Sequence, residues 1–196
     1  PFILNIQEGN NLEKEKVLKA FFRKLIIRRA DVVTVISGYL KLFVSNINPK
    51  SKIVIIPNGI DPAKFDFRSS NPATLDRLKE KIGIKMDERI IITVSRFVSK
   101  NGISDLIGAM PETIKQIPNA KLLIIGNGKL EKNLKDQVRE LSLEKNVLMI
   151  GEVENDNLPN YLLISDIFVR PSLSEGLGTA FLEAMAAGVP IIGTPV

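Results

Sequence analysis

Residues 89–128 read RIIITVSRFVSKNGISDLIGAMPETIKQIPNAKLLIIGNG. Apolar and mostly β-branched residues fill 89–95 and again 120–125, whereas 102–117 has the apolar spacing of an amphipathic helix. Two nearly continuous apolar runs that are joined by such a helix predict parallel strands buried on both faces. This β-α-β unit therefore indicates an α/β domain.

The same alternation continues toward the C-terminal end of the sequence. Further strands are expected at 146–150, 166–170 and 189–193, and further helices at 129–142, 156–164 and 179–187. Each strand is followed by an amphipathic segment, so we predict a doubly wound parallel sheet with helices on both faces. In such sheets ligands bind beyond the carboxyl ends of the strands, which is where functional residues are expected.

The residues before this domain predict part of a second lobe. Strands are expected at 2–6, 31–36 and 52–56, and helices at 12–29 and 38–46. The turn signal Pro57-Asn58-Gly59 is followed by a loop-like stretch, where we place a domain boundary. Our division is 1–50 as the remnant of the first lobe, 51–72 as an interdomain crossover, and 73–196 as the second domain.

The composition excludes several classes of site. The 196 residues contain no cysteine and no histidine, which excludes disulfides, thiolate zinc sites and histidine-dependent triads. No apolar stretch is long enough to span a membrane, and no secretory signal precedes the first strand, so we expect a cytoplasmic protein. The sequence begins at Pro1 and ends directly after an expected strand, so we expect a piece of a longer chain.

The net charge of +5 is concentrated near the N-terminus, where residues 1–60 hold ten Lys/Arg against four Asp/Glu. Much of the excess lies in the expected helix 12–29. Its apolar residues can form one face among the basic ones; they are Leu18, Phe21, Phe22, Leu25 and Ile26. Such a helix can lie on the anionic inner face of a membrane, but the interpretation we favour is packing against a core with a solvated basic face. No nucleic-acid-binding motif accompanies the charge.

Residues 170–190 read RPSLSEGLGTAFLEAMAAGVP and lie between two expected strands. Gly176 and Gly178 allow the backbone to approach a ligand, and the helix that follows offers unpaired N–H groups and the positive end of its dipole. Thr179 is a candidate cap for that helix. These features predict a phosphate-binding turn, although a glycine-rich turn alone is also common in ordinary α/β proteins.

Two carboxylates accompany this turn. Glu175 and Glu183 are separated by seven residues, and ionised carboxylates are acceptors suited to pairs of sugar hydroxyls. The whole stretch resembles the donor-site motif of glycosyltransferase family 4, the retaining group 1 enzymes of GT-B architecture, which contain two Rossmann-like domains. The segments 56–61 (IPNGID) and 123–128 (LIIGNG) also resemble that family, so the resemblance covers nearly the whole chain.

The resemblance implies roles for individual residues. Glu183 would bind the nucleotide ribose and Glu175 the transferred sugar. The backbone that would hold the diphosphate and sugar is that of Gly176, Leu177, Gly178 and Thr179. Arg96 and Lys100 would balance the charge of the departing diphosphate. The family commonly places its lysine five residues after the arginine, where this chain has Asn101, so Lys100 is the weaker assignment.

Other positions are more ambiguous. Gln7 stands where many family members have a histidine; it can bind a sugar hydroxyl but cannot act as a general base. Gly126 and Gly128 either approach the nucleotide or simply form a turn, and the turn is the interpretation we favour. The acidic run Glu152, Glu154 and Asp156 is expected to be a solvated loop. No metal or other cofactor is expected.

The function expected from the resemblance is transfer of a sugar from a nucleoside-diphosphate sugar to the hydroxyl of a sugar or lipid-linked acceptor. The anomeric configuration would be retained, and the product would belong to polysaccharide or glycolipid assembly. Two alternatives stay open: a nucleotide-sugar-binding module without turnover, and a glycoside hydrolase that uses the two carboxylates as acid and nucleophile.

Overall fold

A computed structural model describes residues 1–7, 17–66, 70–175 and 178–195. It divides into two compact units. The first unit comprises Pro1–Gly59 together with Ser174–Thr179, and the second comprises Ile60–Leu173 together with Ala180–Val196. Our division into domains at 50 and 73 stays a prediction.

The first unit contains a three-stranded parallel sheet in the order β1-β2-β3. The strands are β1 (Ile3–Ile6), β2 (Val32–Val35) and β3 (Lys52–Ile55), and the helices are α1 (Val17–Arg29) and α2 (Gly38–Ile47). Val33, Leu40 and Val44 are fully buried in its core. The strand β3 lies within the stretch predicted as crossover and pairs with β2 in this sheet.

The apolar face of helix α1 is exposed, whereas we expected it to pack against the core. Leu18, Phe21 and Phe22 are 69%, 61% and 53% exposed, and Leu25 and Ile26 are exposed as well. Three strands of four residues each offer a small core, which α1 reaches mainly through Ile27, its one buried residue among those described. The favoured interpretation, packing of the apolar face against this core, is therefore wrong. The predicted helical residues 12–16 lie outside the described residues.

The second unit contains a five-stranded parallel sheet in the order β6-β5-β4-β7-β8. Its strands are β4 (Arg89–Val94), β5 (Ala120–Ile125), β6 (Val147–Gly151), β7 (Ile167–Arg170) and β8 (Ile191–Gly193). All five were predicted from the sequence, with ends that differ by one or two residues. The doubly wound parallel sheet is confirmed.

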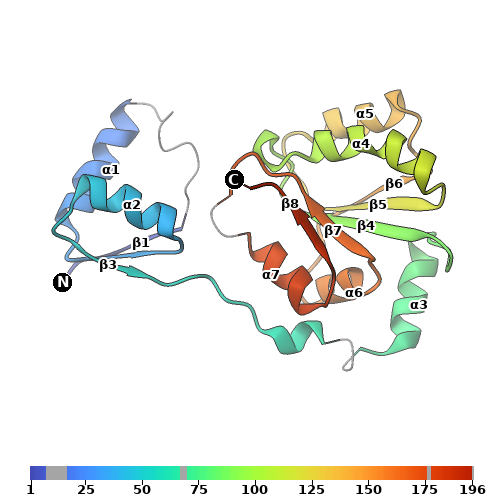
Figure 1. Cartoon of the computed structure of the whole chain (residues 1–196), viewed down its shortest axis with the longest axis horizontal. Helices are drawn as coiled ribbons and strands as arrows, with labels where there is room; N and C mark the ends of the chain where they lie inside the picture. Colours follow the sequence, from blue (N-terminus) through green and yellow to red (C-terminus); the bar gives the residue numbers. More distant parts are fainter. Residues whose placement is uncertain (8–16, 67–69, 176–177, 196) are drawn as a thin grey trace. The chain divides into compact units, whose positions relative to one another are not determined.

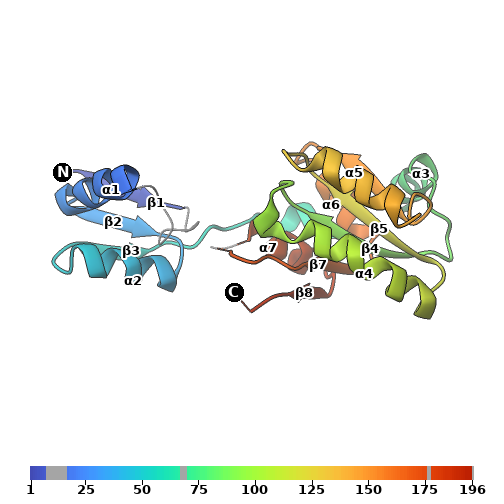
Figure 2. The same cartoon turned by 90° about the horizontal axis from the view of Figure 1, so that it is seen from above.

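Helices cover both faces of this sheet (Figures 1 and 2). On one face lie α4 (Ile103–Gln116) and α5 (Glu131–Glu140); on the other lie α3 (Pro72–Lys81), α6 (Leu158–Leu163) and α7 (Thr179–Ala186). The two faces have separate apolar clusters, one around Phe97 and Met110 and the other around Phe168 and Leu162. Burial on both faces explains why the strands are apolar throughout.

Helix α3 was not predicted from the sequence. The 3-10 helix Pro62–Phe65 precedes it, and the Asn71 side chain caps α3 by accepting a hydrogen bond from the Ala73 N–H at 3.0 Å. Pro72 occupies the first turn, where its missing N–H costs nothing. Leu75 is the buried residue of this helix, and Leu78 packs partly buried against the same core. The capping residue Asn71 followed by Pro72 was the feature of the sequence that could have predicted the start of this helix.

Candidate functional site

The order of the second sheet places a topological switch point between β4 and β7. From β4 the chain proceeds through β5 to β6 on one side, whereas β7 and β8 lie on the other side of β4 (Figure 1). Ligands in doubly wound sheets bind beyond the carboxyl ends of the strands at such a point. Arg96 and Lys100, the two predicted cations, follow β4, and so lie on a segment that flanks this position. Arg170 ends β7 and adds a third cation there.

Asn101 organises the segment that follows β4. It is the last residue of the 3-10 helix Ser99–Asn101, and only 1% of it is exposed. Its side-chain nitrogen donates a hydrogen bond to the Arg96 carbonyl oxygen at 2.8 Å, and its oxygen accepts a long one from the Arg170 guanidinium at 3.5 Å. The residue in the expected lysine position is thus a buried link between the loops that follow β4 and β7.

The backbone joins the same two loops. The Leu173 N–H donates to the Lys100 carbonyl oxygen at 2.7 Å. Gly102 has a φ of 66°, and a side chain at this position would overlap the Pro171 carbonyl group. This close approach requires glycine, and it fixes the chain direction near Lys100.

The loop after β5 packs against the loop after β4 in a similar way. Gly126 and Gly128 have φ values of 130° and 152°. A Cβ atom on Gly128 would lie 2.7 Å from the Phe97 carbonyl oxygen, and a Cβ atom on Gly126 would overlap the Ser95 carbonyl oxygen. These close approaches explain why both positions of the turn are glycine, since a side chain at either would collide with neighbouring backbone. Their approach to a nucleotide stays a prediction.

The guanidinium of Arg96 makes no hydrogen bond or ion pair with any residue in the described part of the chain, and Arg96 is exposed. Arg170, to which no role was assigned from the sequence, also stacks over the Phe181 ring of α7 at 5.9 Å. An arginine at a strand end was the available signal. Its contacts with Asn101 and Phe181 depend on tertiary packing, so they were not predictable.

Glu183 lies on α7, whose Ala180 and Ala184 are buried in the core. The side chain is half-buried, and its carboxylate has no hydrogen bond or ion pair among the described residues. Burial raises the pKa of the Glu183 carboxyl above its ordinary value. A desolvated carboxylate without a partner is costly, and such groups concentrate at binding sites.

The remaining predicted residues are less well defined. Gly178 is buried and Glu175 half-buried, whereas Gly176 and Leu177 lie outside the described residues. Thr179 is the first residue of α7, so it lies within the helix and is not the cap we expected. Gln7 is exposed after β1 in the first unit. Because Ser174–Thr179 group with the first unit, the roles of Glu175 and Gln7 stay predictions.

The acidic loop after β6 makes polar contacts of its own. Glu152 accepts a hydrogen bond from Asn127 at 2.6 Å, Glu154 contacts Asn157 at 3.5 Å, and Asp156 pairs with Lys64 at 3.2 Å. Within the described ranges, no three acidic side chains gather as they would to hold a metal ion.

Two curated relatives are similar to this chain. An uncharacterized glycosyltransferase of Methanocaldococcus jannaschii is 36% identical over 166 residues, which are 84% of this chain and 42% of that protein. A GDP-mannose-dependent monoacylated alpha-(1-6)-phosphatidylinositol monomannoside mannosyltransferase of Corynebacterium glutamicum is 35% identical over 170 residues, 83% of this chain and 44% of that protein. The chain spans less than half the length of these relatives.

The crystal structure of Anabaena HepE with UDP and glucose is similar in fold, with a TM-score of 0.87 at 20% identity; the match covers 100% of this chain and 53% of that one. The parallel sheet of the second unit is accordingly that of a Rossmann-like lobe in the GT-B fold. A sequence model described as glycosyl transferases group 1 matches residues 75–196, which is more than half of the chain. This chain therefore belongs to the group 1 glycosyltransferase family.

Proposed function

We propose that this chain carries the donor-binding half of a retaining family 4 glycosyltransferase that uses a nucleoside-diphosphate sugar. The observation that carries the proposal is the half-buried carboxylate of Glu183, which has no partner among the described residues and lies on a helix next to the switch-point strand β7. A ribose would supply the two hydroxyl donors that this carboxylate lacks, since an ionised carboxylate can only accept hydrogen bonds.

In the proposed reaction the bond between the sugar C1 and the diphosphate oxygen breaks, and the acceptor oxygen forms a bond to C1. Arg96 and Lys100 stabilise the negative charge that develops on the diphosphate. The acceptor attacks from the face that the diphosphate leaves, so the anomeric configuration is retained, and the acceptor proton passes to a departing phosphate oxygen. No residue in this scheme requires a metal ion or another cofactor, and Glu175 holds the transferred sugar.

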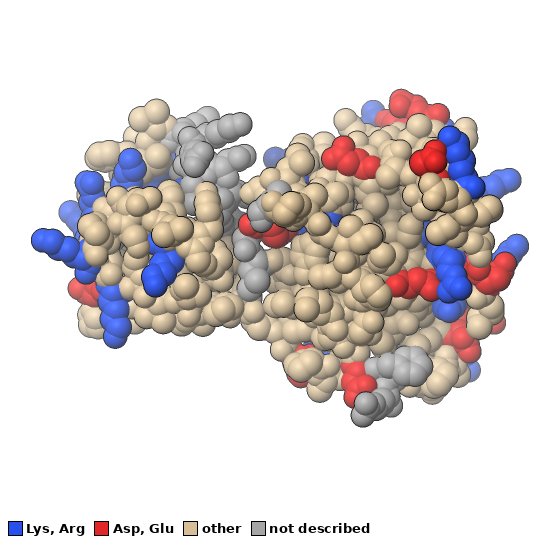
Figure 3. All heavy atoms as spheres, in the orientation of Figure 1, with Lys and Arg blue, Asp and Glu red and all other residues tan. Residues whose placement is uncertain are grey.

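We propose a lipid-linked or sugar acceptor at the cytoplasmic face of a membrane. The name of the Corynebacterium relative describes a mannosyltransferase that acts on a phosphatidylinositol mannoside. In this chain α1 exposes Leu18, Phe21 and Phe22 beside Lys19 and Lys24. Figure 3 shows Lys and Arg spread over the face of the first unit in view, with few acidic side chains. No described helix is long and apolar enough to cross a membrane.

Flotation with vesicles tests this surface. We expect the chain to float with vesicles that contain anionic lipid and to stay in solution with neutral ones, because apolar burial and charge attraction act together. Phe21→Ser with Phe22→Ser should abolish flotation, whereas the matched change Leu42→Ser on the exposed surface of α2 should not. Equal flotation of the two variants would contradict the proposal.

Product analysis tests the reaction itself. We would incubate this chain with UDP-glucose or GDP-mannose and a phosphatidylinositol acceptor, and do the same with a longer chain that has a complete first lobe. NMR would then give the anomeric configuration of the product. An α-linked product from these α-linked donors is expected. A β-linked product would refute retention, and hydrolysis of simple glycosides without a nucleotide would favour the hydrolase. Binding without transfer by both chains would favour a module without turnover.

A further inference from the structure

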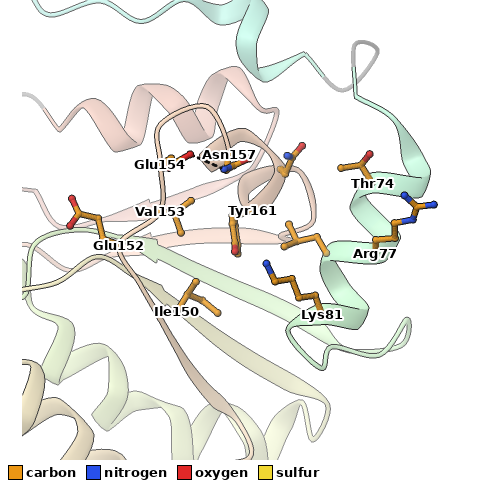
Figure 4. Close-up of a pocket in the computed structure, with 11 residues that line it drawn as sticks. Thr74, Arg77, Lys81, Ile150, Glu152, Val153, Glu154, Asn157 and Tyr161 are labelled. Carbon is orange, nitrogen blue, oxygen red and sulfur yellow. Dashed lines mark hydrogen bonds between the residues drawn. The ribbon is translucent and has the colours of Figure 1, made fainter.

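A groove of about 470 Å³ opens in the second unit between α3, the end of β6 and α6 (Figure 4). Its size falls within the range of small-molecule sites. The strand β6 is at the edge of the sheet and is separated from β4 by β5. Arg96, Lys100 and Glu183 do not line the groove, so it is separate from the switch-point residues.

Two hydrogen-bond donors converge in this groove. The Lys81 side chain extends from α3 toward Tyr161 of α6, as Figure 4 shows. Neither the Lys81 ammonium nor the Tyr161 hydroxyl has a hydrogen bond or ion pair among the residues that the structure describes. Arg77 lies one turn earlier on the same helix and adds a second positive charge at the margin. In Figure 4 the Arg77 guanidinium is turned away from Lys81 and Tyr161, so the groups that can meet a phosphate are one ammonium and one hydroxyl.

The other side of the groove has different chemistry. The carboxylate of Glu154 and the amide of Asn157 lie together, 3.5 Å apart, and turn toward one another in Figure 4. Val153 and Ile150 line the groove with apolar surface. Carboxylate and amide groups can accept and donate hydrogen bonds to hydroxyls, and apolar surface suits the C–H face of a sugar ring.

We propose that this groove is a binding site for a small phosphorylated sugar, distinct from the switch-point site. The phosphate lies against Lys81 and Tyr161, and the sugar hydroxyls lie against Glu154 and Asn157. The charges favour this ligand over a polyanion, because the carboxylate of Glu154 would repel further negative charge at that end.

Calorimetric titration of the chain with glucose 6-phosphate, inorganic phosphate and glucose tests the proposal. We expect one site for glucose 6-phosphate, weaker binding of phosphate and none of glucose. Lys81→Gln should weaken binding by about tenfold or more, since it removes a charged hydrogen bond, and Tyr161→Phe should weaken it less. The matched control Lys85→Gln removes the same charge from an exposed residue just beyond α3 and should leave binding unchanged.

A folded chain that does not bind glucose 6-phosphate would overturn the proposal, as would equal effects of Lys81→Gln and Lys85→Gln. Phosphate that binds as tightly as glucose 6-phosphate would overturn the assignment to a sugar. Binding that Glu183→Ala abolishes and Lys81→Gln does not would place the ligand at the switch point, and would contradict a separate site. Binding that Glu183→Ala leaves unchanged and that Lys81→Gln weakens by about tenfold or more is the result we expect.

Discussion

Replacement of Asn101 by alanine is expected to loosen the loop that carries Arg96 and Lys100. The side chain is 1% exposed and donates a 2.8 Å hydrogen bond to the Arg96 carbonyl oxygen. Its removal deletes this hydrogen bond at a cost of about 0.5–1.5 kcal/mol, while the Arg96 carbonyl oxygen still accepts a hydrogen bond from the Val98 N–H at 2.9 Å. The contact with Arg170 at 3.5 Å is at the limit of a hydrogen bond and adds little. For a chain of this size the melting temperature should fall by about 1–6 °C.

Urea unfolding followed by circular dichroism measures this loss, since the chain contains no tryptophan for fluorescence. Asn133→Ala on the exposed surface of α5 is the matched control and should change the free energy of unfolding by less than about 0.5 kcal/mol. Equal unfolding midpoints for Asn101→Ala and Asn133→Ala would refute the reasoning that Asn101 holds the loop.

Two further substitutions test the turns and the carboxylate. Gly128→Ala should lower the free energy of unfolding by about 2–5 kcal/mol, because it combines a positive φ with a Cβ 2.7 Å from the Phe97 carbonyl oxygen; Gly83→Ala, with a φ of 73° and open space, should cost only about 1–2 kcal/mol. Equal losses of unfolding free energy for Gly128→Ala and Gly83→Ala in urea titrations would show that the backbone moves to relieve the contact with Phe97. Glu183→Gln should stabilise the unliganded chain at pH 7, because burial raises the pKa of this carboxyl and its ionised form opposes folding. Thermal melts should show that the stability gained in Glu183→Gln shrinks as the pH falls through the raised pKa. A melting-temperature difference between the two proteins that is the same at pH 4 and pH 7 would contradict this reasoning.

The strands of the second unit were predictable because burial on both faces leaves a nearly continuous run of apolar residues, which is typical of a parallel sheet. Helix α3 was not recognised because its apolar face is short: Leu75 is its one buried residue and Leu78 is partly buried, whereas most of the other residues are polar or charged. The apolar stripe of α1 was visible in the sequence, but a periodicity does not reveal which surface the stripe meets. The exposure of Phe21 and Phe22 depends on how little core three short strands provide.

At the candidate site, the ends of β4 and β7 were located correctly because parallel strands bring their carboxyl ends to one edge. The part that Asn101 plays could not be predicted, since its amide meets Arg96 and Arg170 only in the folded chain. Gly128 illustrates the same limit, because a glycine is equally typical of an ordinary turn and of a ligand-binding loop. In the folded chain, the close approach of the Phe97 backbone explains why a glycine stands there.

The most direct test of the donor-site proposal is a calorimetric titration of the chain with UDP, GDP and ADP and their sugars, beside Glu183→Ala. We expect one nucleotide to bind and Glu183→Ala to weaken it by about tenfold or more, as loss of a charged hydrogen bond costs about 1.5–3 kcal/mol. Folding of the variant would be verified by circular dichroism. Nucleotide binding of equal strength in the chain and in Glu183→Ala would contradict the role that we propose for this carboxylate.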